Sequence, residues 1–219
     1  MDFFTISLPI KQPTEFQIIN EYKKTDLVNL DVDLLSFTKS QLIDFSYSMF
    51  LEFICEEVNF DILQKFIQVV AENYKSKNRF HNFAHAVCVQ QFAFILISKV
   101  TSTQLTPLES INLLVCALCH DLNHPAVSNK FLNTTLNKLS ILYGFQSTLE
   151  RMHVATTLTI IMDPKYDFYT LPNDKKLEIY QKMTDIILVT DLANAHKLSE
   201  EIRHVPLSST TVLVIHLVF

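Results

Sequence analysis

Four histidines and one aspartate stand in two pairs with the same spacing. His81 and His85 form one pair, and His120 and His124 form the other, with Asp121 directly after His120. On a helix, residues four apart lie on one face, so each spacing predicts two imidazoles about 6 Å apart. Imidazole and carboxylate together are ligands for zinc, iron and manganese. A single histidine on an apolar face is usually a hydrogen-bonded core residue, but two such pairs with an adjacent carboxylate predict a metal site.

The second pair allows another interpretation, because Cys116-Ala117-Leu118-Cys119-His120 has the C-x-x-C-H pattern of c-type haem attachment. Against haem, Asp121 would lie beside an apolar porphyrin, and the N-terminus lacks the basic segment of an export signal. A thioredoxin-like redox pair would need a βαβ pattern around it, whereas the surrounding sequence is helical. Simple packing of both thiols on an apolar helix is the remaining interpretation.

The elements that must position these side chains are predicted to be helices. Thr38-Lys39-Ser40-Gln41 and Thr106-Pro107-Leu108-Glu109 are capping boxes, in which the first and fourth side chains satisfy free backbone N–H groups. Apolar residues recur at helical spacing after each box and over residues 62–70, 131–143, 148–162 and 175–190. Two prolines predict a loop over residues 163–174. We therefore expect one compact, multi-helix, all-α domain.

The composition narrows the classes of function. The chain has 219 residues, of which 48% are hydrophobic and 19% are charged, and it has one glycine, Gly144. A single glycine cannot build a phosphate-binding loop or a dinucleotide-binding fingerprint, which argues against P-loop and Rossmann enzymes. The formal net charge of −5 argues against nucleic acid as the main partner.

The cysteines and the apolar segments bear on location. Cys55, Cys88, Cys116 and Cys119 form no disulfide pattern, and free thiols suit a reducing compartment. No apolar run reaches the roughly 20 residues that a membrane-spanning helix needs. With no signal sequence visible, we expect a cytoplasmic protein without a membrane span.

Several short motifs resemble those of class I 3′,5′-cyclic nucleotide phosphodiesterases, in the same order along residues 38–203. Phe80-His81-Asn82-Phe83-Ala84-His85-Ala86 resembles the H-N-x-x-H-A motif, and His120-Asp121-Leu122-Asn123-His124-Pro125 resembles the H-D-x-x-H-P motif. Ser147-Thr148-Leu149-Glu150-Arg151-Met152-His153 is similar to S-x-L-E-x-x-H, and Thr190-Asp191-Leu192 is similar to the T-D-M step. The segments that most resemble the cyclic-GMP-specific ninth family are Asn73-Tyr74, His81-Asn82-Phe83 and Cys88-Val89, and this resemblance favours cyclic GMP as the substrate.

The resemblance implies an HD-type helical fold and a role for each matching residue. It implies that His85, His120 and Asp121 bind a tight metal ion, expected to be zinc. Asp121 would also bridge to a second ion, expected to be magnesium, with manganese as an alternative. The general acid would be His81, which would protonate the departing ribose oxygen. The groups implied to hold waters of the second ion are His124, Glu150 and Thr190.

The resemblance weakens toward the C-terminus. Beyond the position of Thr190, the family has a further metal-ligand Asp, a Gln that binds the purine and a Phe that clamps it. This sequence has no Asp after Asp191, so we expect the base-binding residues to lie beyond Phe219 and the catalytic domain to be truncated. The expected divisions are an N-terminal extension, the N-terminal part of the catalytic domain and a divergent tail, over residues 1–37, 38–203 and 204–219.

Three functions remain open on this basis. The first is a metal-dependent cyclic nucleotide phosphodiesterase, weakly active if truncated, whose domains could pair as a homodimer. The second is a non-catalytic interaction fragment of the same fold. The third is a different His-Asp phosphohydrolase, which the motif around Glu150 disfavours. One local departure from the family is Ala126, which stands where glycine is usual and is expected to alter the turn after His124.

Overall fold

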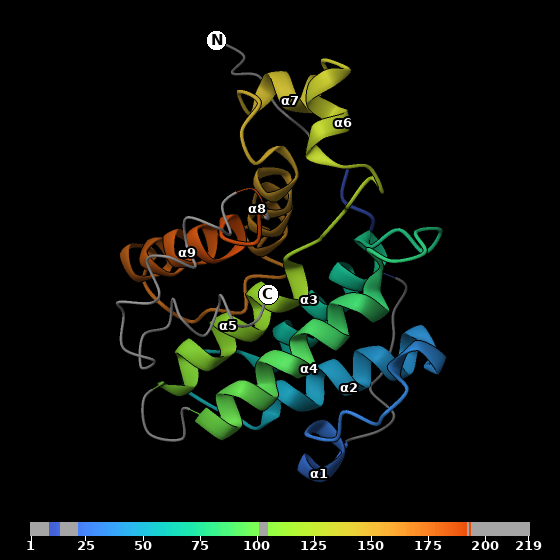
Figure 1. Ribbon diagram of the computed structural model, residues 1–219. Helices are drawn as coiled ribbons and strands as arrows, with labels where there is room; N and C mark the ends of the chain where they lie inside the picture. Colours follow the sequence, from blue (N-terminus) through green and yellow to red (C-terminus); the bar gives the residue numbers. More distant parts are fainter. Residues whose placement is uncertain (1–8, 14–21, 101–104, 192, 194–219) are drawn as a thin grey trace.

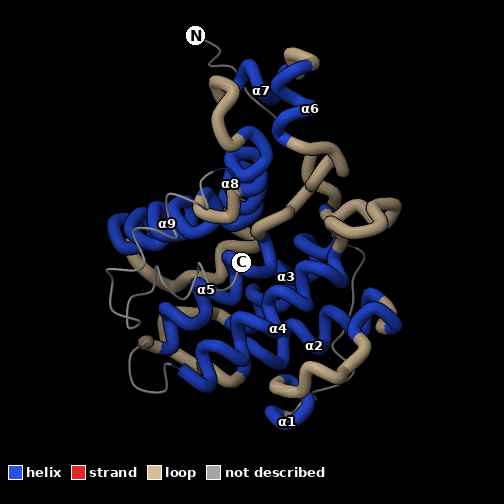
Figure 2. Tube along the Cα trace, viewed as in Figure 1, coloured by secondary structure: helices blue, strands red, loops and turns tan. Residues whose placement is uncertain are grey.

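The computed structural model describes residues 9–13, 22–100, 105–191 and 193 (Figure 1). The only β-type pairing among these residues is an isolated bridge between Val58 and Tyr169, and the tube view shows helices joined by loops (Figure 2). The all-α prediction is therefore confirmed. The helical elements, in chain order, are α1 (Lys24–Leu27), η1 (Leu34–Ser36), α2 (Lys39–Leu51), α3 (Phe60–Asn73), α4 (Phe83–Val100), α5 (Pro107–Cys119), α6 (Asn129–Thr134), α7 (Lys138–Leu142), α8 (Thr148–Ile161) and α9 (Asn173–Leu188).

Helix α4 lies between α2 and α5 and packs against both (Figure 1). A helix that is covered by neighbours is apolar over much of its circumference, and the sequence of α4 has this character. Helix α3 packs on α2, while α9 packs on both α5 and α8. Phe45, Phe66 and Phe94 are fully buried in this core. The packed helices form the platform on which the loops before α4 and after α5 are held.

Polar caps start the helices where the sequence predicts them. Thr38 Oγ1 accepts a hydrogen bond from Gln41 N at 3.3 Å, and Gln41 Oε1 accepts one from Thr38 N at 2.9 Å, which begins α2. Thr106 and Glu109 make the same reciprocal pair at the start of α5. Each such cap stabilises the protein by about 1 kcal/mol relative to alanine. Both capping boxes are confirmed, and the second one sets the direction of α5 toward the histidines that follow it.

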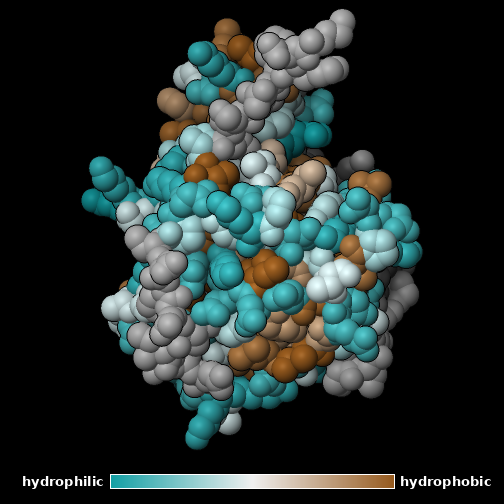
Figure 3. All heavy atoms as spheres, turned by 180° about the vertical axis from the view of Figure 1, so that it is seen from behind, coloured by the Kyte–Doolittle hydropathy of each residue, from teal (hydrophilic) through white to brown (hydrophobic). Residues whose placement is uncertain are grey.

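The apolar period over residues 131–143 is divided between α6 and α7. Leu136 lies between the two helices with a φ of +49°, and this left-handed conformation interrupts helical hydrogen bonding. Asn137 Oδ1 then accepts a hydrogen bond from Leu139 N at 3.0 Å and starts α7. The two helices project from one end of the molecule, where hydrophobic residues reach the surface (Figures 1 and 3). The exposed apolar side chains of this lobe include Phe131, Leu136, Ile141, Leu142 and Phe145.

The segment before residue 38 contributes to the same core. Leu27 and Leu34 are buried in the main hydrophobic cluster, and α1 packs against α2 and α4. Farther upstream, Lys11 and Asn73 exchange two hydrogen bonds of 3.0 Å, N–H to side chain and side chain to C=O. The expected tail over residues 204–219 lies outside the described residues. Across the part of the chain that is described, no helix combines the length and the hydropathy needed to cross a membrane.

Candidate metal and active site

The site is built from two loops that the helix pair α4 and α5 brings together. His85 lies in the first turn of α4, and His81 lies two residues before that helix begins. His120 and His124 both follow the last helical residue of α5. The expectation that each pair shares a helix face is therefore wrong, because the helices begin and end beside the motifs. The first pair still has the expected separation, with ring centroids 6.1 Å apart.

Asp121 is the centre of the site. Its Oδ2 lies 2.8 Å from His81 Nδ1, 3.3 Å from His120 Nε2 and 3.5 Å from His85 Nε2. Its Oδ1 lies 3.7 Å from Nε2 of His153. Four histidines from three segments of the chain thus surround one carboxylate, of which only 14% of the side-chain surface is exposed.

The distances distinguish two kinds of neighbour around Oδ2. Ligands bound to a tetrahedral ion at about 2.1 Å are separated by about 3.4 Å. The separations of His85 and His120 from Asp121 match this value, and the three residues form a group that could hold a metal ion. His120 Nδ1 donates to Ala117 O at 2.8 Å, so in the neutral ring the lone pair lies on Nε2, the atom that faces the carboxylate. The residues present therefore fit a divalent cation.

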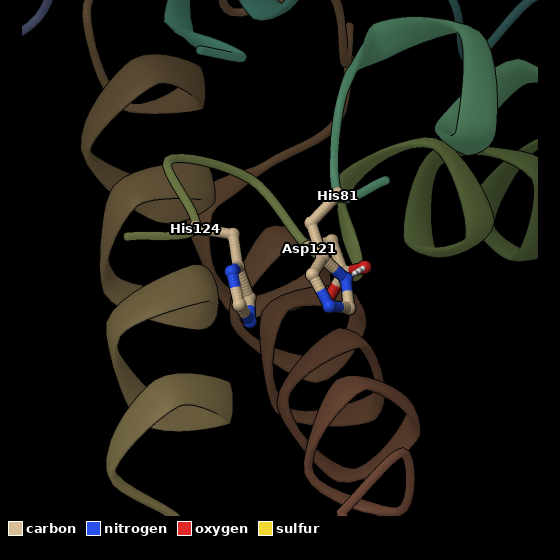
Figure 4. Close-up of side chains that lie close together, drawn as sticks. All are labelled: His81, Asp121 and His124. Carbon is tan, nitrogen blue, oxygen red and sulfur yellow. Dashed lines mark hydrogen bonds and ion pairs between the residues drawn. The ribbon is translucent and has the colours of Figure 1, made fainter. Parts of the chain in front are cut away.

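His81 Nδ1 makes a hydrogen bond to the same oxygen, because 2.8 Å is an ordinary N–H···O distance. The carboxylate accepts, so Nδ1 of His81 carries the hydrogen and only Nε2 is left for other chemistry. His81 is also the most exposed of the histidines around Asp121, with 37% of its side-chain surface exposed. Figure 4 shows the bond to Asp121 and, on the other side, the ring of His124.

His124 stacks on His81, with ring centroids 3.8 Å apart and planes inclined by 22°. The backbone N–H of Ala126 donates to His124 Nδ1 at 2.9 Å, so the neutral ring carries its hydrogen on Nε2. Burial lowers the pKa of His124 to about 4, although the charge of Asp121 opposes this shift. His124 is therefore neutral near pH 7, and its Nε2 is a hydrogen-bond donor rather than a free metal ligand. Asp121, His81 and His124 also form a geometric group, but this tautomer disfavours direct ligation by His124.

The turn that orients His124 has a backbone that usually requires glycine. Ala126 has a φ of +63°, in the left-handed region, and Asn123 has a φ of +65°. Asparagine tolerates this region better than other non-glycine residues, whereas alanine is strained there by about 1–2 kcal/mol. Ala126 therefore stores local strain in the backbone beside the site.

Asp121 and the histidines around it shift one another's pKa. Burial acts to raise the pKa of Asp121, but hydrogen bonds from His120, His81 and His85 outweigh it and hold that pKa far below its usual range. Burial likewise acts to lower the pKa of His120, but hydrogen bonding and attraction to Asp121 raise the pKa overall. Asp121 is thus an anion at any ordinary pH, as a metal ligand must be.

The sequence reasoning gave His153 no role, yet the structure places it against Asp121. It is almost fully buried, and its Nδ1 donates to Leu122 O at 2.6 Å. Burial lowers the pKa of His153 to about 3, so the ring is neutral and its Nε2 lone pair faces the site. The signal in the sequence was its position three residues after Glu150, which puts both on the same side of α8.

Glu150 lies in the first turn of α8 and is half-buried. Asn129 Nδ2 donates to Glu150 Oε2 at 2.9 Å, and Asn129 Oδ1 accepts from Leu149 N at 2.9 Å. Burial raises the pKa of Glu150, and the charges of Asp191 and Asp121 add to this shift. Glu150 is therefore held near the cluster, although no described contact joins it directly to a histidine.

Thr190 follows the last helical residues of α9, and its hydroxyl donates to Ile187 O at 2.7 Å. No described contact links Thr190 to Asp121 or to the histidines. The residue after Thr190, Asp191, joins this segment to the start of α8. Its Oδ2 accepts a hydrogen bond from Ser147 Oγ at 2.7 Å. The end of α9 is thereby fastened to the start of α8.

The cysteine motif does not form a reactive site. Cys116 and Cys119 are both buried within α5, and all four cysteines are unpaired. Burial raises the pKa of Cys119 to about 12, although a hydrogen bond with Thr157 opposes this shift. A thiol with such a pKa is neither a thiolate nucleophile nor a ready metal ligand. Packing is therefore the interpretation that the structure favours.

Comparison with known proteins gives the family. The family model of the 3′5′-cyclic nucleotide phosphodiesterases matches residues 80–212. The 3′,5′-cyclic-nucleotide phosphodiesterase regA of Dictyostelium discoideum is 30% identical over 190 residues, which are 84% of this chain and 24% of that protein. The high affinity cGMP-specific 3′,5′-cyclic phosphodiesterase 9A of Pan troglodytes is 31% identical over 133 residues, which are 60% of this chain and 22% of that protein.

A solved structure shows the same relationship in three dimensions. The phosphodiesterase domain of the Salpingoeca rosetta rhodopsin phosphodiesterase superimposes with a TM-score of 0.80 at 28% identity, covering 88% of this chain and 63% of that domain. The chain spans about a quarter of the length of the two curated relatives named above. The family model covers more than half of this chain, and the matching segment contains the metal-site residues. The chain belongs to the 3′,5′-cyclic nucleotide phosphodiesterase family.

Proposed function

We propose that this chain carries the metal-binding part of a phosphodiesterase site that hydrolyses a 3′,5′-cyclic nucleotide to the 5′-monophosphate. The observation that carries the proposal is the convergence of His81, His85 and His120 on one oxygen of Asp121. Family membership supports this class of substrate, and in the proposal the site would supply the acid and the cation ligands that such a reaction needs.

In this proposal, His85, His120 and Asp121 hold the tighter cation, which we propose to be zinc. The separations between their ligand atoms and the tautomer of His120 support this assignment. A second cation, proposed to be magnesium with manganese as an alternative, would share Asp121. When bound, the two cations would neutralise the phosphodiester and lower the pKa of a water so that it supplies hydroxide near neutral pH.

His81 is proposed to be the general acid. Its Nδ1 is held by Asp121, so the ring can deliver a proton only from Nε2. A general acid needs its hydrogen on the atom that faces the leaving oxygen, and the bond to Asp121 fixes the orientation of that atom. The proton would pass to the 3′ oxygen of ribose as its bond to phosphorus breaks. Asp121 would therefore both bind the cation and orient the acid.

His124, Glu150 and Thr190 are proposed to hold waters of the second cation. For His124, the Nε2 hydrogen of the neutral ring is suited to donate to such a water. For Glu150, the hydrogen bond from Asn129 fixes the carboxylate and leaves its other oxygen to accept. For Thr190, only the resemblance of its motif supports the role.

The proposal also covers the base of the substrate, the extent of the catalytic domain, the compartment and the pairing of chains. Cyclic GMP is the proposed substrate, because one relative is named as cGMP-specific and because Asn73-Tyr74 and Cys88 resemble that subgroup. Residues 38–203 are proposed as the part of the catalytic domain present here, in the cytoplasm, where four free thiols are stable. Pairing of two chains as a homodimer is proposed as well.

Hydrolysis by the purified 219-residue chain tests the proposal. Cyclic GMP and cyclic AMP would each be supplied with Zn²⁺ and Mg²⁺, beside the variant Asp121→Asn. Hydrolysis that the variant loses supports the proposal, and faster hydrolysis of cyclic GMP supports the base preference. Equal rates for the variant and the wild type would reject the site.

A second candidate function is a non-catalytic interaction module with the same fold. It is favoured by the placement of Thr190, which no described contact links to Asp121 or to the histidines. Under this alternative the chain would fold and bind zinc but would leave both cyclic nucleotides intact.

A further inference from the structure

Asn78 joins the two loops that carry the site. Its side-chain Nδ2 donates one hydrogen bond to the carbonyl of His81 and another to the carbonyl of His124, both at 2.9 Å. A side-chain amide has two N–H hydrogens, so both are used to hold one loop against the other. His81 lies before α4 and His124 lies after α5, which makes Asn78 a direct bridge between the two motifs.

Asn78 is itself fixed relative to α4. Its backbone N–H donates to Lys75 O at 3.0 Å, and its carbonyl accepts from Asn82 Nδ2 at 3.0 Å. Asn82 in turn accepts from His85 N at 3.1 Å through Oδ1 and so satisfies a free N–H at the start of α4. Asn78 therefore fixes the backbones of both histidines relative to the start of α4.

The bridge acts where the two imidazoles meet. Their rings stack with centroids 3.8 Å apart, and each ring has its own anchor, Asp121 for His81 and the N–H of Ala126 for His124. Those anchors orient the rings, but the separation of the two backbones is set by the carbonyls that share the Asn78 amide. A change at Asn78 would therefore move one ring relative to the other.

We infer that Asn78 is a positioning residue for the phosphodiester hydrolysis proposed above, because it sets the spacing of His81 and His124 and with it the point from which His81 delivers its proton. The catalytic part of this inference rests on the proposed function, whereas the ring spacing is a property of the chain alone. A misplacement of about 1 Å at a reacting group costs up to about 100-fold in rate.

The amide chemistry of Asn78 makes the inference testable with a nearly isosteric change. Asn78→Asp replaces two donors by a carboxylate that would face two carbonyl oxygens. The matched control is Asn133→Asp, because Asn133 Nδ2 also donates to a backbone carbonyl, that of Phe145 at 3.2 Å, and no described contact joins Asn133 to the histidines or to Asp121. Asn78→Ser, which keeps one hydroxyl donor and adds no charge, provides the same test if the Asp variant fails to fold.

Two measurements on the full chain separate this inference from the proposed function. The first is the proton NMR spectrum of the histidine rings in metal-free protein without substrate, where stacking shifts the ring protons of His81 and His124 upfield. We expect Asn78→Asp to reduce this upfield shift and Asn133→Asp to preserve it. The second is the kinetics of cyclic GMP hydrolysis, where we expect kcat to fall about tenfold or more with KM within about threefold.

Unchanged ring shifts in Asn78→Asp or Asn78→Ser would overturn the inference whether or not the chain is an enzyme. A fall in kcat with a changed KM that Asn133→Asp shows as well would also overturn the inference, because a general loss of folding would explain that result. If the wild type hydrolyses no cyclic nucleotide, the proposed function fails, and the ring shifts still decide whether Asn78 sets the spacing.

Discussion

His81 Nδ1 lies 2.8 Å from Asp121 Oδ2 and makes a hydrogen bond to it. The Nε2 atoms of His85 and His120 are 3.5 Å and 3.3 Å from the same oxygen, which is the separation of ligands around a shared ion. One carboxylate oxygen therefore faces the proposed general acid on one side and the proposed cation position on the other. The chemistry of the site depends on this single side chain.

Asp121→Asn is expected to abolish tight zinc binding, because the amide carries no charge and is a poor ligand. Zinc at about 100 times its Kd would stabilise the wild type by about 2.7 kcal/mol and leave the variant unchanged. Titration calorimetry and thermal unfolding measure these effects. Asp174→Asn, at an exposed position in the first turn of α9, is the charge-matched control and should bind zinc normally. Wild-type affinity in Asp121→Asn would contradict the ligand set.

Acid is expected to destabilise the metal-free protein through His153. Burial lowers its pKa from 6.5 to about 3 in the folded state, so between these pH values the unfolded chain binds more protons. Stability therefore falls as the pH decreases from about 6.5 toward 3. We expect His153→Asn, whose amide can still donate to Leu122 O, to lose less stability between pH 6.5 and pH 4.

Thermal unfolding across this pH range measures the effect in both proteins. The comparison uses the difference between pH 6.5 and pH 4 within each protein, so a general destabilisation of the variant cancels. An equally steep loss of stability in the variant would show that His153 is not the buried neutral group responsible.

Ala126→Gly is expected to stabilise the protein by about 1 kcal/mol. Ala126 has a left-handed φ of +63°, where glycine is free of the strain that a Cβ causes, although the greater entropy of unfolded glycine offsets part of the gain. Chemical denaturation measures the difference. The control is Ala155→Gly in the middle of α8, which should destabilise by about 1 kcal/mol. Destabilisation by both changes would mean that the turn prefers alanine.

Glu150→Gln is expected to leave zinc binding intact while lowering hydrolysis at least tenfold, because the carboxylate is proposed to orient waters of the second cation. The amide keeps the size of the side chain and still accepts from Asn129. Zinc stoichiometry and kcat measured on the same preparation separate the two effects. Glu178→Gln, at an exposed glutamate paired with Lys175, should change neither. Parallel loss of zinc would instead place Glu150 among the direct ligands.

Several helices of this protein could be predicted because their signals are local, but the sequence reasoning gave no bounds for α4. The boxes at Thr38 and Thr106 and the apolar spacing after them placed α2 and α5 within a residue or two. The division of residues 131–143 was missed, since the left-handed Leu136 has no signal of its own in the sequence. Leucine has a high intrinsic helix propensity, whereas the backbone at Leu136 leaves the helical conformation.

The metal cluster could be predicted in composition but not in geometry. The spacing of the two histidine pairs beside Asp121 predicted a metal site. The resemblance to a family implied that His85, His120 and Asp121 are its ligands and that His81 is the acid. The helical placement of the pairs was wrong because α4 begins after His81 and α5 ends before His120. Spacing alone cannot show where a helix ends, because an i, i+4 pair across a helix end still leaves the two rings close.

The sequence by itself determined which residue types are available and the family to which they belong, because motifs and caps depend on neighbours along the chain. Only the tertiary structure decided which atoms meet. It brought His153 of α8 to Asp121, set two hydrogen bonds from Asn78 across the loops, and assigned the proton of His124 to Nε2 through the turn at Ala126. These contacts join segments far apart in the chain, so they arise from helix packing, which no local pattern encodes.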